Sequence, residues 1–351
     1  MDKMTINEQI IDMKKKLGDK IIIPAHHYED PQIVEVSEFV GDSYKLAVDC
    51  AKTDAEFIVF CGVYFMAEAA DILSQSNQKV IMPNLSAGCP MADQINRKQA
   101  EKAVKLIQKR TPKQIAPVVY MNSYADIKSF CGKQDGSVCT SSNASEIIDY
   151  YLKQDKAVFF TPDFNLGINT AHKLGLADNE IVKVEQDMEI NDSYDPAKVK
   201  MYIWDGFCHV HKVFTVQDII ELRSQYENIK IIVHPECDRG VVNNSDISGS
   251  TQKIYNEIKN SPAGSVWGVG TEYNFVKRIA DEFPDKTILP LKKSICHNMA
   301  KITSEKLLTS LGSINAYIKE GLELKNVVSV DEEDKENAAR ALNKMIEIVE
   351  S

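Results

Sequence analysis

The chain has 351 residues, of which 44% are hydrophobic and 26% are charged, and its formal net charge is −10 at pH 7. A chain of this length is too long for a single small hydrophobic core, and two or three domains are expected. The acidic balance, without a basic stripe, disfavours nucleic acid as a partner, and no apolar run approaches the roughly 20 residues of a membrane span. Because the N-terminus is polar and lacks the apolar segment of a signal peptide, we expect a cytoplasmic protein without membrane contact.

Eight cysteines occur without any Cys-x-x-Cys pair. In a reducing compartment, cysteines that matter are more often metal-binding or catalytic than part of a disulfide scaffold. The missing pair disfavours a zinc ribbon, a thioredoxin-like redox site and a local ferredoxin-type cluster. Any metal site must therefore be assembled from distant parts of the chain.

The first part of the chain alternates helices and strands and ends in a cysteine. An amphipathic helix is expected over residues 1–19, and a buried strand over 20–28 ends in His26, His27 and Tyr28. The next elements are a helix at 31–39, a helix that Gly41-Asp42-Ser43 opens, a strand at 56–62, a helix at 67–74, and a strand at 79–82 that leads to Cys89.

The same order of landmarks occurs twice more. In the second pass, a strand at 116–120 ends in Tyr120-Met121-Asn122, Ser141 precedes a helix at 144–152, and strands at 157–160 and 198–204 lead to Cys208. In the third pass, a strand from Lys230 ends in His234-Pro235-Glu236, Gly249-Ser250-Thr251 opens a helix at 252–260, and strands at 266–272 and 286–291 lead to Cys296. A fixed order across three passes predicts three similar α/β units.

Strands that alternate with helices predict an α/β fold with parallel sheets that helices cover on both faces. The expected domains are residues 1–110 with the N-terminal helix, 111–228, 229–298, and a helical tail over 299–351 that packs on them. The middle unit is the longest, and its extra residues are expected at 175–198, an acidic and loop-rich insertion.

Polar side chains at the strand ends and hydroxyls at the helix openings form the expected site. In parallel α/β units, functional groups gather at the carboxyl ends of the strands. Free N–H groups at helix starts bind phosphate or carboxylate, so the serines and threonine there are candidates as well. If the three units face a common axis, the following residues meet there: His26, Tyr28, Ser43, Tyr120, Asn122, Ser141, His234, Glu236, Ser250 and Thr251.

One cysteine from each unit would meet on the same axis. Three thiolates without an obvious fourth protein ligand fit zinc or a four-iron cluster, each with one open position. An open metal position acts as a Lewis acid, and Glu236 is then the best general acid–base candidate, with a structural carboxylate as the competing reading. His209 and His211 are expected to orient the Cys208 loop rather than to bind the metal.

A set of motifs over about residues 20–305 resembles, in order, those of the quinolinate synthase family. The motifs are Pro24-Ala-His-x-Tyr28, Gly41-Asp-Ser43, Gly88-Cys89-Pro-Met-Ala, Tyr120-x-Asn122, Cys139-Thr-Ser-Ser-Asn143, Pro162-Asp-x-x-Leu-Gly167, Trp204-x-Gly-x-Cys208-x-Val-His211, His234-Pro-Glu-Cys237, Gly249-Ser-Thr251 and Cys296-x-x-Met299.

The resemblance implies three similar α/β/α domains with short parallel sheets around a pseudo-threefold axis. It implies one [4Fe-4S] cluster per chain, held by Cys89, Cys208 and Cys296, with one open iron. It also implies that iminoaspartate and dihydroxyacetone phosphate condense to quinolinate, with loss of phosphate and water, on the route to NAD. A transient contact with L-aspartate oxidase is a further expectation.

The resemblance also implies roles for individual residues. Glu236 and His234 would move protons, and Tyr28 beside His26 would be a gate or a proton relay. Lys293 and Met299 stand where some family members have cysteines, so a local dithiol switch is not expected. The residues expected to line the substrate pocket are His26, Ser43, Tyr120, Met121, Asn122, Ser141, His234, Pro235, Glu236, Ser250 and Thr251.

Two other functions fit parts of the sequence. One is a zinc-stabilised protein that holds an anionic metabolite without turnover, and the other is an iron–sulfur electron carrier. Neither function requires His, Glu, Tyr and Ser at every strand end, and this favours the enzyme.

Overall fold

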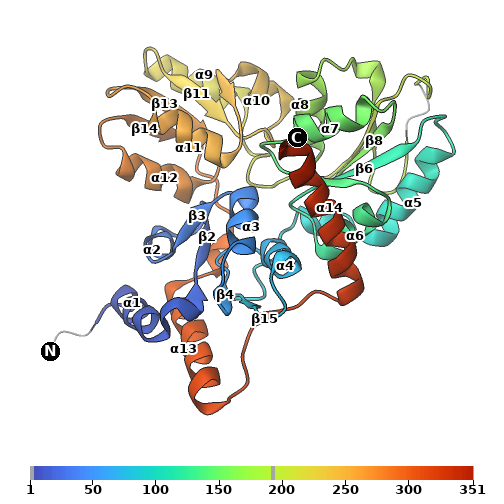
Figure 1. Cartoon of the computed structure of the whole chain (residues 1–351). Helices are drawn as coiled ribbons and strands as arrows, with labels where there is room; N and C mark the ends of the chain where they lie inside the picture. The colour runs from blue at the N-terminus through green and yellow to red at the C-terminus, as the bar shows by residue number, and fades with distance from the viewer. Residues whose placement is uncertain (1–3, 191–193, 351) are drawn as a thin grey trace. The chain divides into compact units, whose positions relative to one another are not determined.

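The computed structural model describes residues 4–190 and 194–350. Residues 1–3 of the expected N-terminal helix, 191–193 of the expected insertion and 351 of the expected tail lie outside the described residues. The chain forms two compact units, Met1–Cys89 with Ile295–Asp331 and Pro90–Ser294 with Glu332–Ser351. Figure 1 labels most of the helices and strands of both units.

The first unit contains a four-stranded sheet in the order β1-β4-β5-β15, parallel except for β15. A parallel pair of β2 and β3 is joined to it by a bridge between Ala25 and Cys61. Helix α1 packs along α13 (Figure 1). The elements are α1 (Ile6–Leu17), β1 (Ile21–Ile22), β2 (Pro24–His26), α2 (Pro31–Glu35), β3 (Phe39–Gly41), α3 (Ser43–Ala51), β4 (Phe57–Val59), α4 (Tyr64–Leu73), β5 (Lys79–Ile81), α13 (Ser304–Glu320) and β15 (Val327–Val328).

The second unit contains two parallel sheets, in the orders β7-β6-β8-β10-β9 and β12-β11-β13-β14. Strands β6 and β8 are buried along their whole length, as expected for a sheet covered on both faces. The strands are β6 (Ile115–Tyr120), β7 (Ser137–Cys139), β8 (Ala157–Thr161), β9 (Ile181–Val184), β10 (Met201–Trp204), β11 (Lys230–Val233), β12 (Ile247–Ser248), β13 (Val266–Gly270) and β14 (Thr287–Pro290). The helices are α5 (Arg97–Gln108), α6 (Ala125–Lys133), α7 (Ala144–Leu152), α8 (Phe164–Lys173), α9 (Val216–Gln225), α10 (Arg239–Asn244), α11 (Thr251–Lys259), α12 (Tyr273–Glu282) and α14 (Glu332–Glu350).

One strand order occurs three times along the chain. In each pass the first strand lies between the second and the third, and the fourth lies next to the third. The three instances are β3-β2/β1-β4-β5, β7-β6-β8-β10 and β12-β11-β13-β14. The predicted α/β fold with parallel sheets is therefore confirmed, whereas the boundaries of three separate domains stay a prediction.

The openings of α3 and α11 share one local design. Asp42 and Ser250 cap these helices by accepting from the backbone N–H groups of Lys45 and Lys253, at 3.1 and 3.3 Å. The lysine stem then folds back over a glycine: a Cβ at Gly249 would lie 2.4 Å from Lys253 Cδ, and Gly41 has the same contact with Lys45. A Cβ at either glycine would push this lysine stem aside.

Several elements differ from the sequence-based expectation. The segment 31–39 was expected to be one helix, but α2 ends at Glu35 and Phe39–Gly41 pairs with β2 as a strand. The expected insertion contains β9, which extends the five-stranded sheet at its edge. Within the expected helical tail, Ser304–Glu320 forms one helix that runs through Gly312, and β15 follows it before α14.

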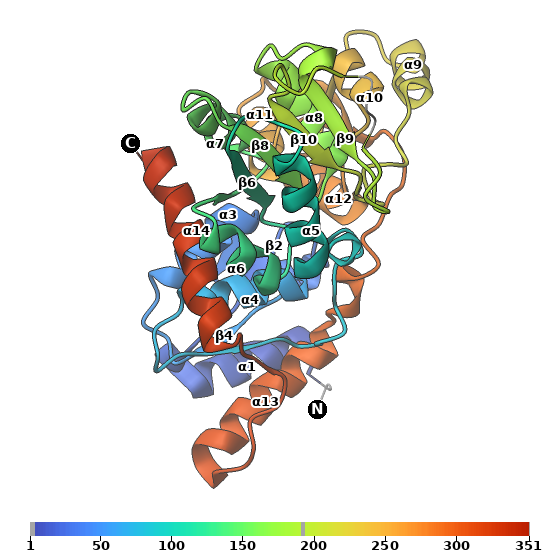
Figure 2. The ribbon, with the colours of Figure 1, turned by 90° about the vertical axis from the view of Figure 1, so that its right-hand side faces the viewer.

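Helix α14 closes the second unit against α6, and Figure 2 shows the two helices side by side. The approach is close because Gly132 has no side chain: a Cβ there would lie 1.8 Å from the Asn337 carbonyl oxygen. Arg97 also binds Asp334 at the start of α14, at 2.5 Å. In the part of the chain that the structure describes, no helix is long and apolar enough to cross a bilayer.

Candidate active site

Glu236 lies at the centre of a buried hydrogen-bonded network in the second unit. It follows β11, and only 2% of the residue is exposed. Its Oε1 accepts a hydrogen bond from the Tyr120 hydroxyl at 2.6 Å, and its Oε2 lies 2.7 Å from His211 Nδ1. His211 Nε2 in turn lies 3.0 Å from the Thr271 hydroxyl. The ends of β6, β11 and β13 and the loop after β10 therefore bring four functional side chains together.

The surroundings of Glu236 keep its carboxylate ionised at neutral pH. Burial by itself raises the pKa of Glu236, but His234 and His211 in their protonated forms and the hydrogen bonds from His211 and Tyr120 outweigh burial and lower it to about 2. An ionised carboxylate only accepts, so His211 carries a proton on Nδ1, and its Nε2 lies within hydrogen-bond distance of the Thr271 hydroxyl. Because Thr271 is fully buried, we infer that its hydroxyl orients His211.

His234 is held as a neutral imidazole. Its Nδ1 accepts a hydrogen bond from the backbone N–H of Glu236 at 3.3 Å, and its ring stacks on His211 with 4.4 Å between the centroids. Burial and then His211 lower the pKa of His234 to about 3, although Glu236 opposes the shift. Since Nδ1 accepts, the proton of the neutral ring is on Nε2, which makes that atom a hydrogen-bond donor.

Asp163 supplies a second buried carboxyl group near Glu236. It caps helix α8 by accepting from the backbone N–H of Leu166 at 2.6 Å. Burial and the nearby Glu236 raise the pKa of Asp163 well above its usual range, while the backbone N–H groups of Leu166 and Cys208 act against the shift. The pKa values of the two carboxyl groups are thus shifted in opposite directions, that of Glu236 down and that of Asp163 up, a division typical of acid–base sites.

Asn169 holds the turn that carries Glu236. This residue lies on α8, in the preceding α/β pass, and its Nδ2 donates to the carbonyl oxygens of Pro235 and Cys237, both at 2.9 Å. The two acceptors flank Glu236 on either side. A single side-chain amide therefore fixes the backbone on both sides of the ionised carboxylate.

Polar atoms without a protein partner gather at the carboxyl end of the five-stranded sheet. After β6 these atoms are Asn122 Oδ1 and Ser123 Oγ, and at the end of β8 the atom is Thr161 Oγ1. Within the described residues, each of these buried atoms lacks a hydrogen-bond partner. Buried polar atoms are rarely left unsatisfied, so this edge is suited to a ligand or to ordered water. Asn122 is among the predicted substrate-binding residues.

The three predicted ligand cysteines differ from the other five in exposure. Cys89, Cys208 and Cys296 are partly exposed, whereas the remaining five of the eight are buried. Burial raises the pKa of each of those five thiols, Cys50, Cys61, Cys131, Cys139 and Cys237, which disfavours the thiolate that binds metal. The sulfur of Cys208 and one ligand atom each of His211 and Glu236 lie within 4.8 Å of one another.

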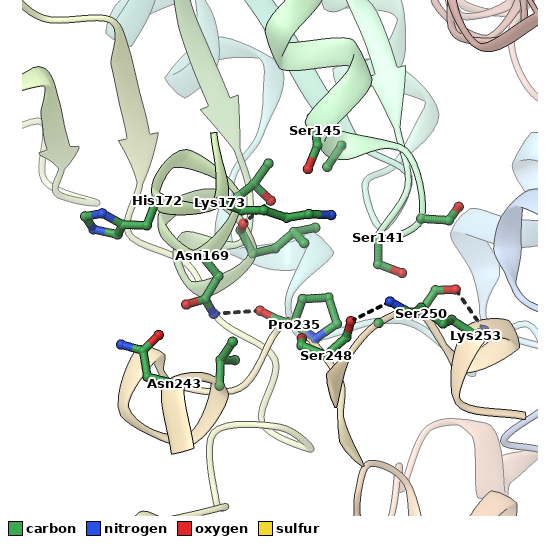
Figure 3. A pocket seen from close by; sticks show the side chains of 16 residues that line it. Ser141, Ser145, Asn169, His172, Lys173, Pro235, Asn243, Ser248, Ser250 and Lys253 are labelled. Atoms are coloured by element: carbon green, nitrogen blue, oxygen red, sulfur yellow. Dashed lines mark hydrogen bonds between the residues drawn. The ribbon is translucent and has the colours of Figure 1, made fainter. Parts of the chain in front are cut away.

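A pocket of about 480 Å³ opens between α7–α8 on one side and α10–α11 on the other, all in the second unit (Figure 3). Three of its lining residues were predicted to bind substrate: Ser141, Pro235 and Ser250. The predicted Thr251, the first residue of α11, is 3% exposed. Met121 and Tyr120 are also buried, at the end of β6.

In the first unit, His26 and Tyr28 repeat the local contact of His234 and Glu236. His26 Nδ1 accepts from the backbone N–H of Tyr28 at 3.2 Å, and the Tyr28 ring meets His26 edge-on with 4.5 Å between centroids. Ser43 is the first residue of α3. Cys89 and Cys296 belong to the same unit, while the remaining predicted residues belong to the second. A common centre for both sets stays a prediction.

The sequence-based reasoning missed three parts of the site. His211 was expected to orient the Cys208 loop, and it binds Glu236 directly. Asp163 and Asn169 were not singled out as functional residues. The motif Pro162-Asp-x-x-Leu-Gly167 could have indicated Asp163, because aspartate is a preferred residue at the start of a helix and α8 begins directly after it. No comparable signal exists for Asn169, whose acceptors lie 66 and 68 residues away in sequence.

Parallel sheets that present an ionised glutamate, a neutral histidine and a partly exposed thiol at strand ends define an α/β enzyme with an acid–base site. The quinolinate synthetase A protein family matches residues 8–347 of the chain. A quinolinate synthase of Bacillus pumilus (strain SAFR-032) is 42% identical over 345 residues, which cover 97% of this chain and 92% of the relative. Relatives of the same description from Bacillus cereus (strain Q1) and Lysinibacillus sphaericus (strain C3-41) are 40% and 39% identical, covering 99% and 97% of this chain and 95% and 93% of their own. The chain belongs to the quinolinate synthetase A family.

Proposed function

We propose that this chain condenses iminoaspartate with dihydroxyacetone phosphate to quinolinate, with release of phosphate and water, in de novo NAD biosynthesis. Family membership over nearly the whole chain supports the activity. The observation that carries the proposal is the Glu236 network, in which Tyr120 and His211 hold an ionised carboxylate at the end of β11. A condensation with loss of water needs such a group, because protons must leave carbon and nitrogen and be delivered to departing hydroxyls.

Two side chains of the second unit would handle these protons and charges. Glu236 would draw a proton from the substrate through Tyr120, whose hydroxyl donates to it. His234 would donate a hydrogen bond from Nε2 to a substrate oxygen, since its pKa of about 3 keeps the ring neutral. His234 would also move protons, as expected from the sequence, and would do so through Nε2, because its Nδ1 accepts from the backbone N–H of Glu236.

The remaining predicted residues would bind substrate. Helix openings with hydroxyls suit the phosphate and carboxylate groups of the two substrates. Asn122 would supply its unsatisfied Oδ1 to a donor on the substrate. Tyr28 would act as a gate or a proton relay next to His26. The other binding residues in this proposal are Ser43, Met121, Ser141, Pro235, Ser250 and Thr251.

The cofactor in this proposal is a [4Fe-4S] cluster with one open iron, held by Cys89, Cys208 and Cys296. The donor set fits, because these three thiols are partly exposed and the other five are buried. When bound, the cluster supplies Lewis-acid chemistry at its open iron. We further propose three α/β/α domains around a pseudo-threefold axis, a cytoplasmic location, and a transient contact with L-aspartate oxidase that delivers the unstable imine.

The experiment is an anaerobic assay of quinolinate and phosphate with the protein as purified and after iron and sulfide reconstitution. The proposal predicts quinolinate and phosphate in equal amounts and activity that rises with cluster content. A fully loaded protein that makes neither product contradicts the activity. If zinc rather than iron is bound and a substrate is held without reaction, the chain is a metabolite-binding protein.

A further inference from the structure

The pocket between α7–α8 and α10–α11 has a basic wall in an acidic protein. Two lysines, Lys173 and Lys253, line it, and no aspartate or glutamate is among the described residues that do so. His172 lies in the same wall, and its Nε2 is 3.2 Å from Asp178 Oδ1. The whole chain carries a formal charge of −10. Because exposed charges are screened within about 8 Å at physiological salt, this local excess rather than the global charge determines which ligand is attracted.

Lys253 is built into the pocket wall. Its backbone N–H binds the capping Ser250, its stem lies against Gly249, and its Nζ donates to the Ser248 carbonyl oxygen at 3.4 Å. Figure 3 shows its amine reaching back toward Ser248. Lys173 lies at the end of α8, and in Figure 3 its side chain extends across the pocket toward Ser141. Neither lysine forms an ion pair with a carboxylate in the described part of the chain.

Hydrogen-bond donors complete the wall. Helices α7 and α11, each nine residues long, begin at this pocket, and their first turns add positive partial charge. Five serine hydroxyls line it: Ser141, Ser142, Ser145, Ser248 and Ser250. Two ammonium groups, hydroxyls and two helix starts form a donor set that suits a doubly charged phosphate monoester.

The pocket runs from the surface to the residues proposed to bind substrate. Lys173 and Lys253 are exposed, whereas Ser250 is 3% exposed. Ser141, Pro235 and Ser250 belong to both the pocket and the proposed substrate site, but the two lysines belong only to the pocket. Pro235 also precedes Glu236, and Asn169 in the same wall binds its carbonyl oxygen.

We propose that this pocket is an outer binding site for a phosphate monoester, in which Lys173 and Lys253 take up the phosphate group before it reaches the reacting residues. The identity of the ligand as the phosphorylated substrate rests on the proposed function, whereas binding of a phosphate monoester does not. The site makes no contribution to the chemical step. It raises the rate of productive capture and lowers KM for the phosphorylated substrate alone.

The test uses the holoenzyme and the unreactive monoester sn-glycerol 3-phosphate in a calorimetric titration. Loss of two charged hydrogen bonds predicts that Lys173→Gln/Lys253→Gln weakens binding by at least about tenfold. Lys173→Arg/Lys253→Arg keeps both charges and should restore most of the affinity. The matched control is Lys105→Gln/Lys277→Gln, which removes two exposed charges on α5 and α12 and should change affinity less than about twofold.

Turnover supplies the second readout. The double glutamine variant should raise KM for dihydroxyacetone phosphate about tenfold, with kcat and the KM for iminoaspartate unchanged within about twofold. Equal monoester binding by the parent and the double glutamine variant, or no binding by the parent, overturns the outer site. A protein that binds the monoester through these lysines but makes no quinolinate keeps the outer site and refutes the proposed function. If the double glutamine variant makes quinolinate with the parent's KM for dihydroxyacetone phosphate, the outer site is refuted and the proposed function stands.

Discussion

His211 Nδ1 lies 2.7 Å from Glu236 Oε2, and both residues are 2% exposed. A buried carboxylate is costly unless its oxygens are paired, and here His211 and Tyr120 occupy one oxygen each. The arrangement therefore holds Glu236 in its charged form, and in the proposed function a proton reaches it through Tyr120. The following predictions test this network and its supports.

The thiol assignment predicts a contrast between two cysteines near Glu236. Cys208→Ala should remove the iron and sulfide of the anaerobically purified protein, because a thiolate ligand is lost. Cys237→Ala should leave the metal content unchanged, since Cys237 is fully buried and its pKa is raised. Iron and sulfide analysis of both variants decides the matter. Full iron content in Cys208→Ala contradicts the assignment.

Asn169 is predicted to act as a positioning residue for Glu236. Asn169→Asp is nearly isosteric but replaces the donor for the Pro235 and Cys237 carbonyl oxygens with a carboxylate. We expect kcat to fall about tenfold with the cluster retained, and the acidic limb of the kcat/KM profile to move to higher pH. Asn256→Asp, an exposed change of the same chemistry on α11, is the control. An unchanged pH profile with lowered thermal stability would indicate a structural role only.

Replacement by alanine should have opposite effects on stability at two helical glycines, Gly132 in α6 and Gly312 in α13. A Cβ at Gly132 would lie 1.8 Å from the Asn337 carbonyl oxygen, so Gly132→Ala must displace α14 and should destabilise the protein by about 1–3 kcal/mol. In α13, nothing lies within 4 Å of a Cβ at Gly312, so Gly312→Ala should stabilise by about 0.5–1 kcal/mol. Urea unfolding measures both. A neutral Gly132→Ala would show that α14 adjusts freely.

His234 predicts a pH dependence of stability. Its pKa is lowered from 6.5 to about 3, so below pH 6.5 the unfolded chain binds a proton that the folded chain refuses. The free energy of unfolding should therefore fall as pH drops below 6.5, with a slope of up to about 1.4 kcal/mol per pH unit from this residue. His234→Gln should remove that part of the slope. If the urea midpoint changes by the same amount between pH 7.5 and about pH 5 in the parent and in the variant, the buried neutral imidazole is contradicted.

Much of the fold was predictable because the alternation of strands and helices along the chain indicates parallel sheets. The three passes of strand, helix opening and cysteine are visible in the sequence, and the same strand order occurs in all three. Strands as short as β3, β7 and β12 were missed, since two or three residues carry no periodicity and pair only because a neighbour is present. Segment 31–39 illustrates this, as its last residue belongs to β3 rather than to a helix.

The site was predictable where functional groups follow strands directly. Tyr120 is the last residue of β6, and Glu236 follows β11. In the structure the Tyr120 hydroxyl lies 2.6 Å from Glu236 Oε1. The supports were less visible: Asn169 is one of many helical asparagines until its acceptors are seen, and the bond from His211 to Glu236 depends on how the loop after β10 turns. The residues of the first unit repeat the His-x-Tyr contact locally, and their part in the reaction stays a proposal.

The most direct measurement compares Glu236→Gln with the parent enzyme in an anaerobic assay of quinolinate, with iron and sulfide determined on the same samples. Glutamine keeps the size of the side chain and removes the charge that Tyr120 and His211 stabilise. We predict about four iron and four sulfide per chain in both proteins, and a kcat at least about a hundredfold lower in the variant. Near-parental kcat at equal iron content would contradict Glu236 as the acid–base group.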